Sequence, residues 1–463
     1  MLTIGLEVHC QLHSARKLFS MAPIGKVSSF DLGLPGSLPI VNMHCIGIGV
    51  KIAKSLQCRI NSPVRFDRKH YSYPDLFPGY QITQKFNPIG VNGLVHTINK
   101  HNERLEIGIE CVQLEQDTAK TVMVVDGEYE LDAGRAGVAL AEIVTKPDIR
   151  SAYDAVATLK ALQSVIRTLG VGSGNMEDGS LRCDVNVSKN RKPKIELKNL
   201  NSFKDVYDSI EYESIRFDKE SIVMETRRWD PLNKKSFSTR SKETQKDYKF
   251  IPDADIPLIH IPDCIVSEIK VPQLPYELAL ELINKHQIDQ IEALKIAHDP
   301  LLLHYFNVIT TICPAKDVLK WISDFEGMKN QHSTSYEPTL KNIAIYNAIN
   351  PHTMKQFLSL VSTRQVTGLN TKYLFSKLIN TTESFELLAK PYLNQDINIK
   401  ALIDQLLNDH PSQKQDAFST NLIKRKKVKS WLVGKVLKQT HSKVDPKLVT
   451  KALEDKLSKS SKS

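Results

Sequence analysis

Polar side chains with the chemistry of metal and phosphate ligands alternate with apolar side chains in the middle of the chain. The alternation runs through DGSLRCDVNVS, residues 178–188, and KIELKNLNSF, residues 194–203. Because strand side chains point to opposite faces in turn, each segment is predicted to be a strand with one buried and one polar face. A single polar strand face is just as well explained by exposure to solvent. Two such faces in close succession favour a site that binds a metal or phosphates. The polar faces carry Asp184, Asn186, Glu196 and Lys198.

The same alternation opens the chain. From Thr3 to Leu12 the even positions are apolar, whereas Glu7, His9 and Gln11 share the opposite face of the predicted strand. A carboxylate and an imidazole two residues apart can bind one ion, which would be Mg²⁺ or Mn²⁺, with the imidazole favouring Mn²⁺ or Zn²⁺. Taken alone, His9 is better explained as an ordinary surface or hydrogen-bonded histidine.

Two further glutamates can complete this carboxylate set. Glu115 in QLEQDTAK and Glu142 in ALAEIVTKPD each lie near the end of a predicted strand. Each one singly is more often a surface acid. The chain lacks the GxxxxGK[ST], GxGxxG and GxSxG motifs, so any ATP is bound by other means than a P-loop. No nucleophile that would hydrolyse glutamine can be recognised from spacing.

Bases and tyrosines gather around prolines in residues 62–84. Their guanidinium and ammonium groups can donate to phosphates, and the rings offer stacking surfaces. The composition slightly favours the alternative, a rigid loop packed on the sheet. The residues concerned are Arg65, Arg68, Lys69, Tyr71, Tyr73 and Tyr80.

Length and composition indicate a soluble protein of two or three domains. The chain has 463 residues, of which 41% are hydrophobic and 25% charged, and no apolar run is long enough to cross a bilayer. We find no secretory or amphipathic leader before the first predicted strand, which suits a cytosolic protein, a mature organellar form or a trimmed chain. The seven cysteines are scattered singly, so we expect no disulfide framework or zinc knuckle, and a reducing compartment.

Positive charge is concentrated at the C-terminal end. Residues 421–463 contain 13 Lys and Arg but 3 Asp and Glu, a local net charge of +10 that equals the net charge of the whole chain. Lysine clusters bind phosphodiester backbones through counterion release, although solvated basic tails are also common. We favour nucleic-acid binding through KRKKVK, which supplies Lys424, Arg425, Lys426, Lys427 and Lys429.

Glycine and turn signals divide the chain into a β-rich part and a helical part. All but three of the 20 glycines lie at or before Gly179. Asp126-Gly127 between two apolar runs predicts a β-hairpin, and 151–170 has the cap signals and periodicity of a helix. We therefore predict an α+β protein with domains at 1–266, 267–394 and 395–463.

Eight motifs follow one another along the chain. They are IGLEVHCQL, LGLPGSLPIVN, FDRKHYSYPDLFPGYQITQ, GRAGVALAEIVTKPDIRS, GNMEDGSLRCDVNVS, IELKNLNSF, ETRRWD and RSKETQKDYKFIPDADIP. Together they resemble the B subunit family of glutamyl-tRNA(Gln) amidotransferase, and they occur in the family's order. The C-terminal WLVGKVLKQTHSKVDPKLV resembles its YqeY-like tail, so the resemblance covers nearly the whole chain.

The resemblance implies a fold and a reaction. The fold would be a β-rich, cradle-shaped catalytic domain, an all-α domain and a small YqeY-like helical tail. With ATP and Mg²⁺ the B subunit would phosphorylate the glutamyl carboxylate of Glu-tRNA(Gln), and ammonia would then displace phosphate to give Gln-tRNA(Gln). An amidase A subunit would supply the ammonia, and a small third subunit, C-type or fungal F-type, would complete a heterotrimer.

The resemblance also implies roles for particular residues. Glu7, His9, Glu115 and Glu142 match the family's metal-binding positions and are predicted to bind Mg²⁺. A second set is predicted to lie near the nucleotide or the acyl end of the tRNA. That set consists of Arg182, Asp184, Asn186, Lys198 and Asn199.

Departures from the family pattern suggest which member this is. QLEQDTAK replaces the common HLEEDAGK, and Ser20, Ser28 and Ser29 stand where many relatives have zinc-binding cysteines. We expect no zinc, and a mitochondrial matrix protein of fungal type, with the bacterial cytoplasm as the alternative. Two rival functions are a non-catalytic tRNA-binding scaffold, against which the intact Glu7 and His9 argue, and a stand-alone metal-dependent hydrolase, against which the basic tail argues.

Overall fold

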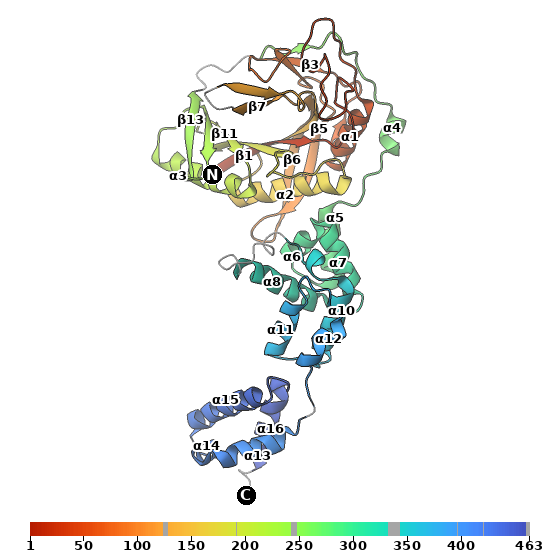
Figure 1. Cartoon of the computed structure of the whole chain (residues 1–463). Helices are drawn as coiled ribbons and strands as arrows, with labels where there is room; N and C mark the ends of the chain where they lie inside the picture. Colours follow the sequence, from red (N-terminus) through yellow and green to blue (C-terminus); the bar gives the residue numbers. More distant parts are fainter. Residues whose placement is uncertain are drawn as a thin grey trace. The chain divides into compact units, whose positions relative to one another are not determined.

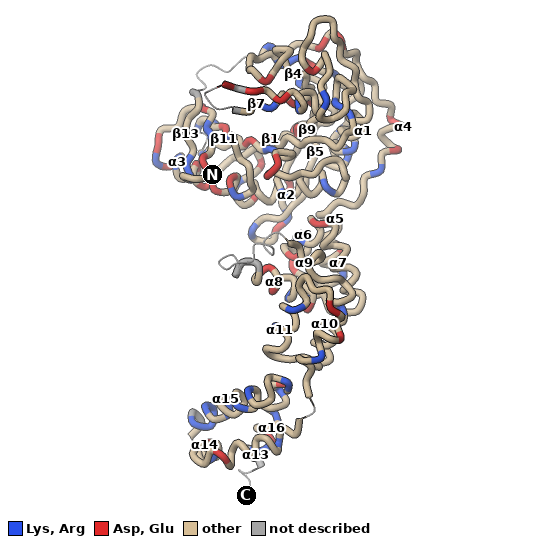
Figure 2. The backbone as a smooth tube through the Cα atoms, in the orientation of Figure 1, with Lys and Arg blue, Asp and Glu red and all other residues tan. Residues whose placement is uncertain are grey.

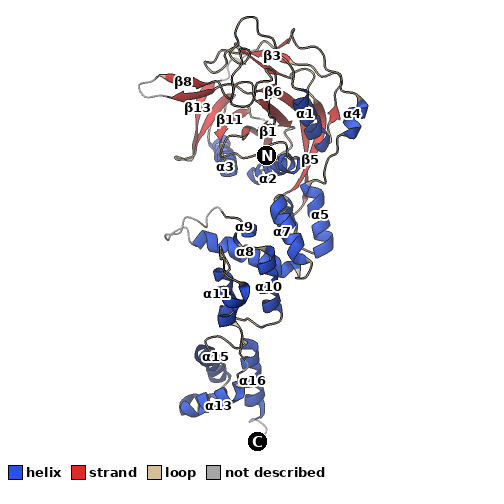
Figure 3. Cartoon of the chain, turned by 45° about the vertical axis from the view of Figure 1, so that its right-hand side comes forward, coloured by secondary structure: helices blue, strands red, loops and turns tan. Residues whose placement is uncertain are grey.

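The computed structural model describes residues 1–123, 128–190, 192–241, 248–331, 343–395, 397–419 and 421–459. The chain divides into two compact units, Met1–Asp299 and Pro300–Ser463. The strands belong to the first unit, and the described elements of the second unit are helices (Figure 3). The predicted α+β class, with a β-rich domain followed by helices, is confirmed.

A nine-stranded mixed sheet forms the framework of the first unit. Its order, β13-β12-β11-β10-β1-β9-β6-β5-β2, puts the first strand of the chain in the middle. Strand β1 pairs antiparallel with β10 on one side and with β9 on the other, so side chains of all three strands meet on each face. The strands are β1 (Leu2–Gln11), β2 (Arg59–Ile60), β5 (Gly90–Ile98), β6 (Arg104–Gln116), β9 (Ala139–Thr145), β10 (Leu181–Lys189), β11 (Ile195–Leu200), β12 (Glu225–Asp230) and β13 (Lys235–Ser241).

Three helices cover one face of this sheet (Figure 1). They are α1 (Met43–Ser55), α2 (Ala152–Leu169) and α3 (Phe203–Lys219). The predicted alternation in β1 is confirmed, because its even positions from Ile4 to Cys10 are fully buried whereas Glu7 and His9 are only partly buried. The apolar face of β1 thus packs in the core, and the other face carries the polar side chains. The buried residues are Ile4, Leu6, Val8 and Cys10.

Helix α2 begins and ends where the cap signals predict. The Ser151 hydroxyl accepts a hydrogen bond from the backbone N–H of Asp154 at 3.1 Å, which satisfies one free donor of the first turn. Gly170 ends the helix in the left-handed conformation, with φ of 68°, which a residue without a Cβ adopts at little cost. The predicted hairpin strands also form, as β7 (Lys120–Met123) and β8 (Tyr129–Asp132), whereas the Asp126-Gly127 turn lies outside the described residues.

A small sheet lies near the opposite face of the large one and contains part of the 62–84 segment. It consists of β3 (Asp67–His70), β4 (Tyr80–Thr83) and β14 (Ile251–Pro252). The Arg68 guanidinium donates to Asp253 and Asp255, each at 2.7 Å, and lies 4.4 Å from the ring centre of Tyr80. Arg68 therefore holds this sheet together, which agrees with the structural interpretation of the segment.

Three helices that follow the sheet along the chain group with it in the first unit. Helices α5 (Pro275–His286) and α6 (Gln290–Ala297), which we assigned to the helical domain, belong to the first unit, as does α4 (Asp263–Glu268). Among the described residues, none of the helices combines the length and apolar character needed to cross a membrane. All seven cysteines are free thiols, as expected.

The second unit contains two groups of helices. Trp321, Phe357 and Phe375 pack ring against ring in the first group, with centroids 4.6 to 5.4 Å apart. The last four helices enclose a core of their own that joins Ile403 to Leu453. The helices are α7 (Pro300–Thr310), α8 (Ala315–Gln331), α9 (Ile345–Ala348), α10 (Pro351–Ser362), α11 (Leu369–Lys377), α12 (Phe385–Ala389), α13 (Ile399–Asp409), α14 (Pro411–Ala417), α15 (Leu422–Gln439) and α16 (Pro446–Lys459).

A fully buried ion pair in the loop after β1 gives a stability prediction. The Lys17 ammonium lies 3.0 Å from the Asp31 carboxylate, and neither side chain is exposed. Lys17→Met leaves a buried carboxylate without its partner, so we expect the free energy of unfolding to fall by about 3 to 5 kcal/mol. Urea unfolding followed by circular dichroism measures the change. Lys26→Met, at an exposed lysine of the same loop, should change it by under about 0.5 kcal/mol, and equal effects of the two substitutions would contradict the prediction.

Candidate active site

His9 forms a cluster with two glutamates from neighbouring strands on the polar face of the sheet. Strand pairing sets His9 of β1 directly opposite Glu142 of β9, and Glu115 comes from β6 on the far side of β9. The His9 Nε2 atom lies 3.3 Å from Glu115 Oε1 and 3.8 Å from Glu142 Oε1. One ligand atom from each residue lies within 4.8 Å of the others, so the three can surround one ion.

Glu7 belongs to a second cluster on the other side of β1. Its partners are Asp184 of β10, which stands directly opposite it, and Glu196 of β11. The Asn186 amide donates to Glu7 Oε1 at 2.6 Å, and the Lys198 ammonium lies 2.5 Å from Asp184 and 3.1 Å from Glu196. This cluster therefore contains its own counterion.

The structure divides the four predicted metal ligands between the two clusters. Glu115 and Glu142 come together with His9, whereas Glu7 contacts residues of the predicted nucleotide set. Because Glu7 and His9 are two residues apart on one strand, the clusters lie side by side, about 7 Å apart along β1. The strand face predicted from alternation thus presents two groups of ligands in place of one.

Proton affinities in the first cluster are coupled. Burial alone would lower the pKa of His9, but the carboxylates of Glu142 and Glu115 outweigh it and raise the value to about 9. Burial also opposes ionisation of Glu115, yet the hydrogen bond and charge of His9 hold the pKa of Glu115 below its usual value. Burial raises the pKa of Glu142. Without an ion the site therefore contains an imidazolium paired with the Glu115 carboxylate.

The donor set of this cluster fits a divalent cation. Mn²⁺ is bound by carboxylates together with imidazole. Mg²⁺ also prefers carboxylate oxygens, and its sites contain fewer nitrogen donors. The Glu115 Oε2 atom is buried and accepts no hydrogen bond within the described residues, which leaves a carboxylate oxygen free for an ion. In the second cluster the Lys198 ammonium already lies between two acids, so an ion there would displace it or share its ligands.

The remaining predicted site residues differ in how close they come to the clusters. Arg182 stands opposite His9 in β10, and its guanidinium lies 3.1 Å from Asp117. Asn199 points away from the clusters. It lies at a bulge between β10 and β11 with a φ of 67°, and its amide donates to the Trp229 carbonyl at 3.3 Å. Arg182 thus lies on the face that carries the clusters and Asn199 does not contact them.

Three residues at the site were not assigned to it from sequence. Gln113, two residues before Glu115 on β6, donates to Glu142. Asp117 holds Arg182 and also lies 3.5 Å from Arg135. The charge of Lys69 helps to lower the pKa of Glu115, although His9 has the larger effect on that pKa. The spacing Gln113, Glu115, Asp117 in QLEQD, with every second residue polar, is the signal that identifies two of them.

The predicted tRNA-binding residues lie on one helix of the second unit. Lys424, Arg425, Lys426, Lys427 and Lys429 all belong to α15, which carries a row of basic residues in Figure 2. Lys424 pairs with Asp416 at 3.1 Å and Lys429 with Glu454 at 3.2 Å. Lys426 and Lys427 are exposed and form no ion pair within the described part of the chain.

The raised pKa of His9 predicts how stability depends on pH when divalent ions are removed. The unfolded histidine titrates near 6.5 and the folded one near 9, so protonation stabilises the fold fully below pH 6.5. This contribution is lost as pH rises from 6.5 to 9. With EDTA present, the difference in unfolding free energy between wild type and His9→Asn should shrink over that range. A difference that stays constant from pH 6 to 9.5 would contradict the ion-paired imidazolium.

Comparison with known proteins identifies the family. The profile described as the GatB/GatE catalytic domain matches residues 2–267, and the one described as the GatB domain matches residues 305–457. Relatives named as the B subunit of an aspartyl/glutamyl-tRNA(Asn/Gln) amidotransferase include one from Legionella pneumophila, 32% identical over 98% of each chain, and one from Thermosipho melanesiensis, 34% identical over 96% of each chain. A third, from Rickettsia prowazekii, is 31% identical over 98% of this chain and 97% of its own.

These relatives are bacterial and give no support to the predicted mitochondrial form. The matches cover both the sheet domain that carries the two acidic clusters and the helical end of the chain. Together with the similarity over almost the full length, they show that this chain belongs to the GatB family.

Proposed function

We propose that this chain is the B subunit of a glutamyl-tRNA(Gln) amidotransferase and that its sheet activates the glutamyl group of Glu-tRNA(Gln) with ATP. The observation that carries the proposal is the pair of acidic clusters, His9 with Glu115 and Glu142, and Glu7 with Asp184 and Glu196. Cations flank these acids, so the face offers ligands for metal ions and donors for phosphates together. The names of the relatives support the same function.

Two reactions would follow one another at this face. A carboxylate oxygen of the glutamyl group attacks the γ-phosphorus of ATP, the bond to ADP breaks, and an acyl phosphate forms. Ammonia then attacks the acyl carbon, loses a proton and expels inorganic phosphate, which leaves the amide of Gln-tRNA(Gln). When bound, Mg²⁺ neutralises the anionic oxygens that meet in the first reaction. The residues that would hold it are His9, Glu115 and Glu142, with Glu7 and Asp184 beside them.

Residues of the chain supply orientation and positive charge. Asn186 fixes the Glu7 carboxylate by donating to it, and Asp117 holds the Arg182 guanidinium on the clustered face. The Lys198 ammonium lies between Asp184 and Glu196, and the carboxylates raise its pKa despite the opposing effect of burial, so it stays charged. A permanent positive charge next to the acids can pair with phosphate oxygens once these enter.

The source of ammonia would be another protein. We found no nucleophile suited to glutamine hydrolysis, and the relatives are named as subunits. We propose a heterotrimer with an amidase A subunit and a small third subunit, C-type or fungal F-type, that acts on Glu-tRNA(Gln). The compartment would be the mitochondrial matrix or, in keeping with the bacterial relatives, the bacterial cytoplasm.

Reconstitution tests the division of labour. With glutamine, ATP and Glu-tRNA(Gln), the chain alone should form no Gln-tRNA(Gln), whereas the complex with its partner subunits should form it and release one phosphate for each amide. The readouts are phosphate released from ATP labelled at the γ-position and the amino acid on the tRNA. Glutamine-dependent amide formation by the single chain would reveal a second active site and contradict the proposed division.

A further inference from the structure

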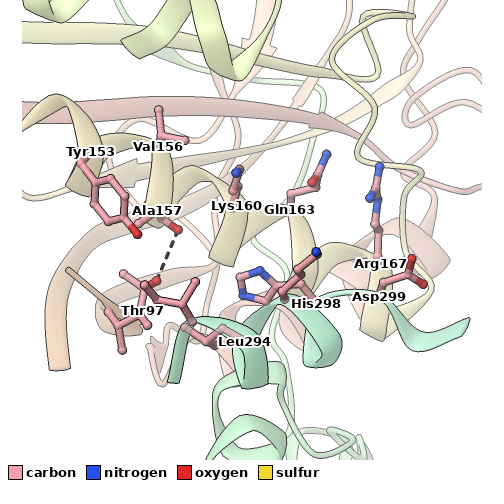
Figure 4. A pocket seen from close by; sticks show the side chains of 13 residues that line it. Thr97, Tyr153, Val156, Ala157, Lys160, Gln163, Arg167, Leu294, His298 and Asp299 are labelled. Carbon is pink, nitrogen blue, oxygen red and sulfur yellow. Dashed lines mark hydrogen bonds between the residues drawn. The ribbon is translucent and has the colours of Figure 1, made fainter. Parts of the chain in front are cut away.

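A groove lies on the helix-covered side of the first unit, away from the acidic clusters. It has a volume of about 420 Å³ and lies between α2 and α6, and Thr97 and Ile98 at the end of β5 also line it (Figure 4). The lining residues of α2 recur every three, four or seven positions from Tyr153 to Arg167, so they form one stripe along the helix. This volume falls in the range of pockets that hold small organic ligands.

One part of the groove is apolar. Side chains of α2, of α6 and of the last residue of β5 line it, and Leu294 is almost completely buried whereas Ile291 is 44% exposed. An apolar surface that is partly buried and partly open to water favours an apolar group of a ligand. The apolar lining consists of Ile98, Val156, Ala157, Ile291 and Leu294.

Basic side chains line the rest of the groove. Lys160 and Lys295 come from the two facing helices and are both exposed. Lys295 has no ion pair or hydrogen bond within the described residues, and Lys160 lies 5.6 Å from the ring centre of Phe203. Arg167 donates to the Ser173 carbonyl and to Asn175, so it is fixed in place at the groove's edge.

The other titratable lining residues leave the groove positively charged. Burial, helped by the charge of Lys160, lowers the pKa of His298 to about 4, so its imidazole is neutral at physiological pH. Asp299 is the one acid among the lining residues, against two lysines and an arginine. A divalent cation would meet net repulsion here, whereas an anion would be attracted.

We propose that this groove binds a small organic anion, with its apolar body against Leu294 and Ala157 and its carboxylate, phosphate or sulfonate between Lys160 and Lys295. Such a ligand would contact α2, which packs on the sheet, and α6 at once. The site is separate from the proposed catalytic face, because α2 covers the opposite side of the sheet from the polar side chains of β1. The inference does not depend on the proposed function.

A pair of fluorescent probes can distinguish binding to the apolar part of the groove from binding to its basic part. Anilinonaphthalene sulfonate carries an apolar ring system and one negative charge, and N-phenylnaphthylamine carries the same rings without the charge. Titration of the full-length chain should show one saturable site for each probe. The charged probe should bind about tenfold or more tightly, because hydrogen bonds to charged groups add to the apolar contact.

Three variants locate the binding. The double substitution Lys160→Glu/Lys295→Glu should weaken the charged probe about tenfold or more and change the neutral probe by under about twofold. Ala157→Leu, which fills the apolar part, should abolish saturable binding of both. Lys285→Glu, at an exposed lysine of α5 outside the groove, is the matched control and should bind both probes as wild type does. Circular dichroism confirms that each variant is folded.

Two results would overturn the inference. If the double lysine variant and Ala157→Leu bind both probes as the wild type does, the anion binds elsewhere and the groove is not its site. If the free chain binds the charged probe but the reconstituted complex excludes it, the groove is covered by a partner subunit and is a docking surface. Equal affinities of the wild-type chain and the wild-type complex, with loss in the variants, support the proposal.

Discussion

Glu7→Gln is expected to abolish ATP-dependent amide formation in the reconstituted complex while glutamine hydrolysis by the partner subunit continues. The substitution keeps the size of the side chain and an oxygen that can accept the hydrogen bond from Asn186. What it removes is the negative charge opposite Asp184 on the polar face of β1. We expect the rate of Gln-tRNA(Gln) formation to fall about a hundredfold or more, as for the loss of one charge-stabilising group at other active sites.

A matched variant and a second measurement make this result interpretable. Glu110→Gln changes an exposed acid on β6, outside both clusters, and should retain wild-type activity. Binding of Mn²⁺, followed by the loss of its free-ion electron paramagnetic resonance signal, should be weakened by Glu115→Gln and unaffected by Glu110→Gln. Near wild-type amide formation by Glu7→Gln would favour the rival function, a tRNA-binding scaffold without chemistry.

The alternation of apolar and polar residues was enough to predict which face of β1 is buried and which is polar. A strand has a period of two, so Glu7 and His9 had to share a face opposite Ile4 and Leu6, and they do. The residue pattern of one strand does not indicate which strands lie beside it in the sheet. The order that sets β1 between β9 and β10 brings Glu142 opposite His9 and Asp184 opposite Glu7, which divides the predicted ligands into two clusters.

Local geometry accounts for what the sequence did not predict. Lys198 and Asn199 were both predicted to lie at the site, but only the Lys198 ammonium contacts the acids. At the bulge opposite Asp184, Asn199 has a positive φ and its amide donates to the Trp229 carbonyl instead. The groove between α2 and α6 depends on α6 packing with the first unit. Nothing in the periodicity of residues 290–297 indicates which domain that helix joins.

Two exposed lysines of α15, Lys426 and Lys427, are expected to make the largest contributions to tRNA binding. Lys424 and Lys429 already pair with Asp416 and Glu454, so part of their charge is neutralised within the protein. Lys426 and Lys427 are exposed and have no such pair in the described part of the chain. Their ammonium groups are therefore available to phosphates, and release of counterions from the tRNA would drive the binding.

Substitution is a sharper test of this helix than truncation. Residues 421–459 supply Leu432, Val436 and Val449 to the core that also contains Ile403 and Leu406 of α13. Removing them would expose that core and could change tRNA binding through unfolding alone. Neutralising exposed lysines leaves the core intact, because exposed substitutions usually cost under about 0.5 kcal/mol.

Lys426→Gln/Lys427→Gln should weaken binding of Glu-tRNA(Gln) to the reconstituted complex and flatten its dependence on salt. Each lost phosphate contact lowers the magnitude of the slope of log K against log salt concentration by about 0.7 to 0.9, so two lost contacts should lower it by about 1.5. Lys424→Gln/Lys429→Gln should have the smaller effect, since those lysines have acidic partners. Lys204→Gln/Lys219→Gln, at exposed lysines of α3 in the first unit, is the control for net charge and should leave the slope unchanged. Filter binding across a salt series measures all four proteins. If the slopes of the wild type and the Lys426/Lys427 variant coincide, α15 is a solvated helix and tRNA is held by other parts of the chain.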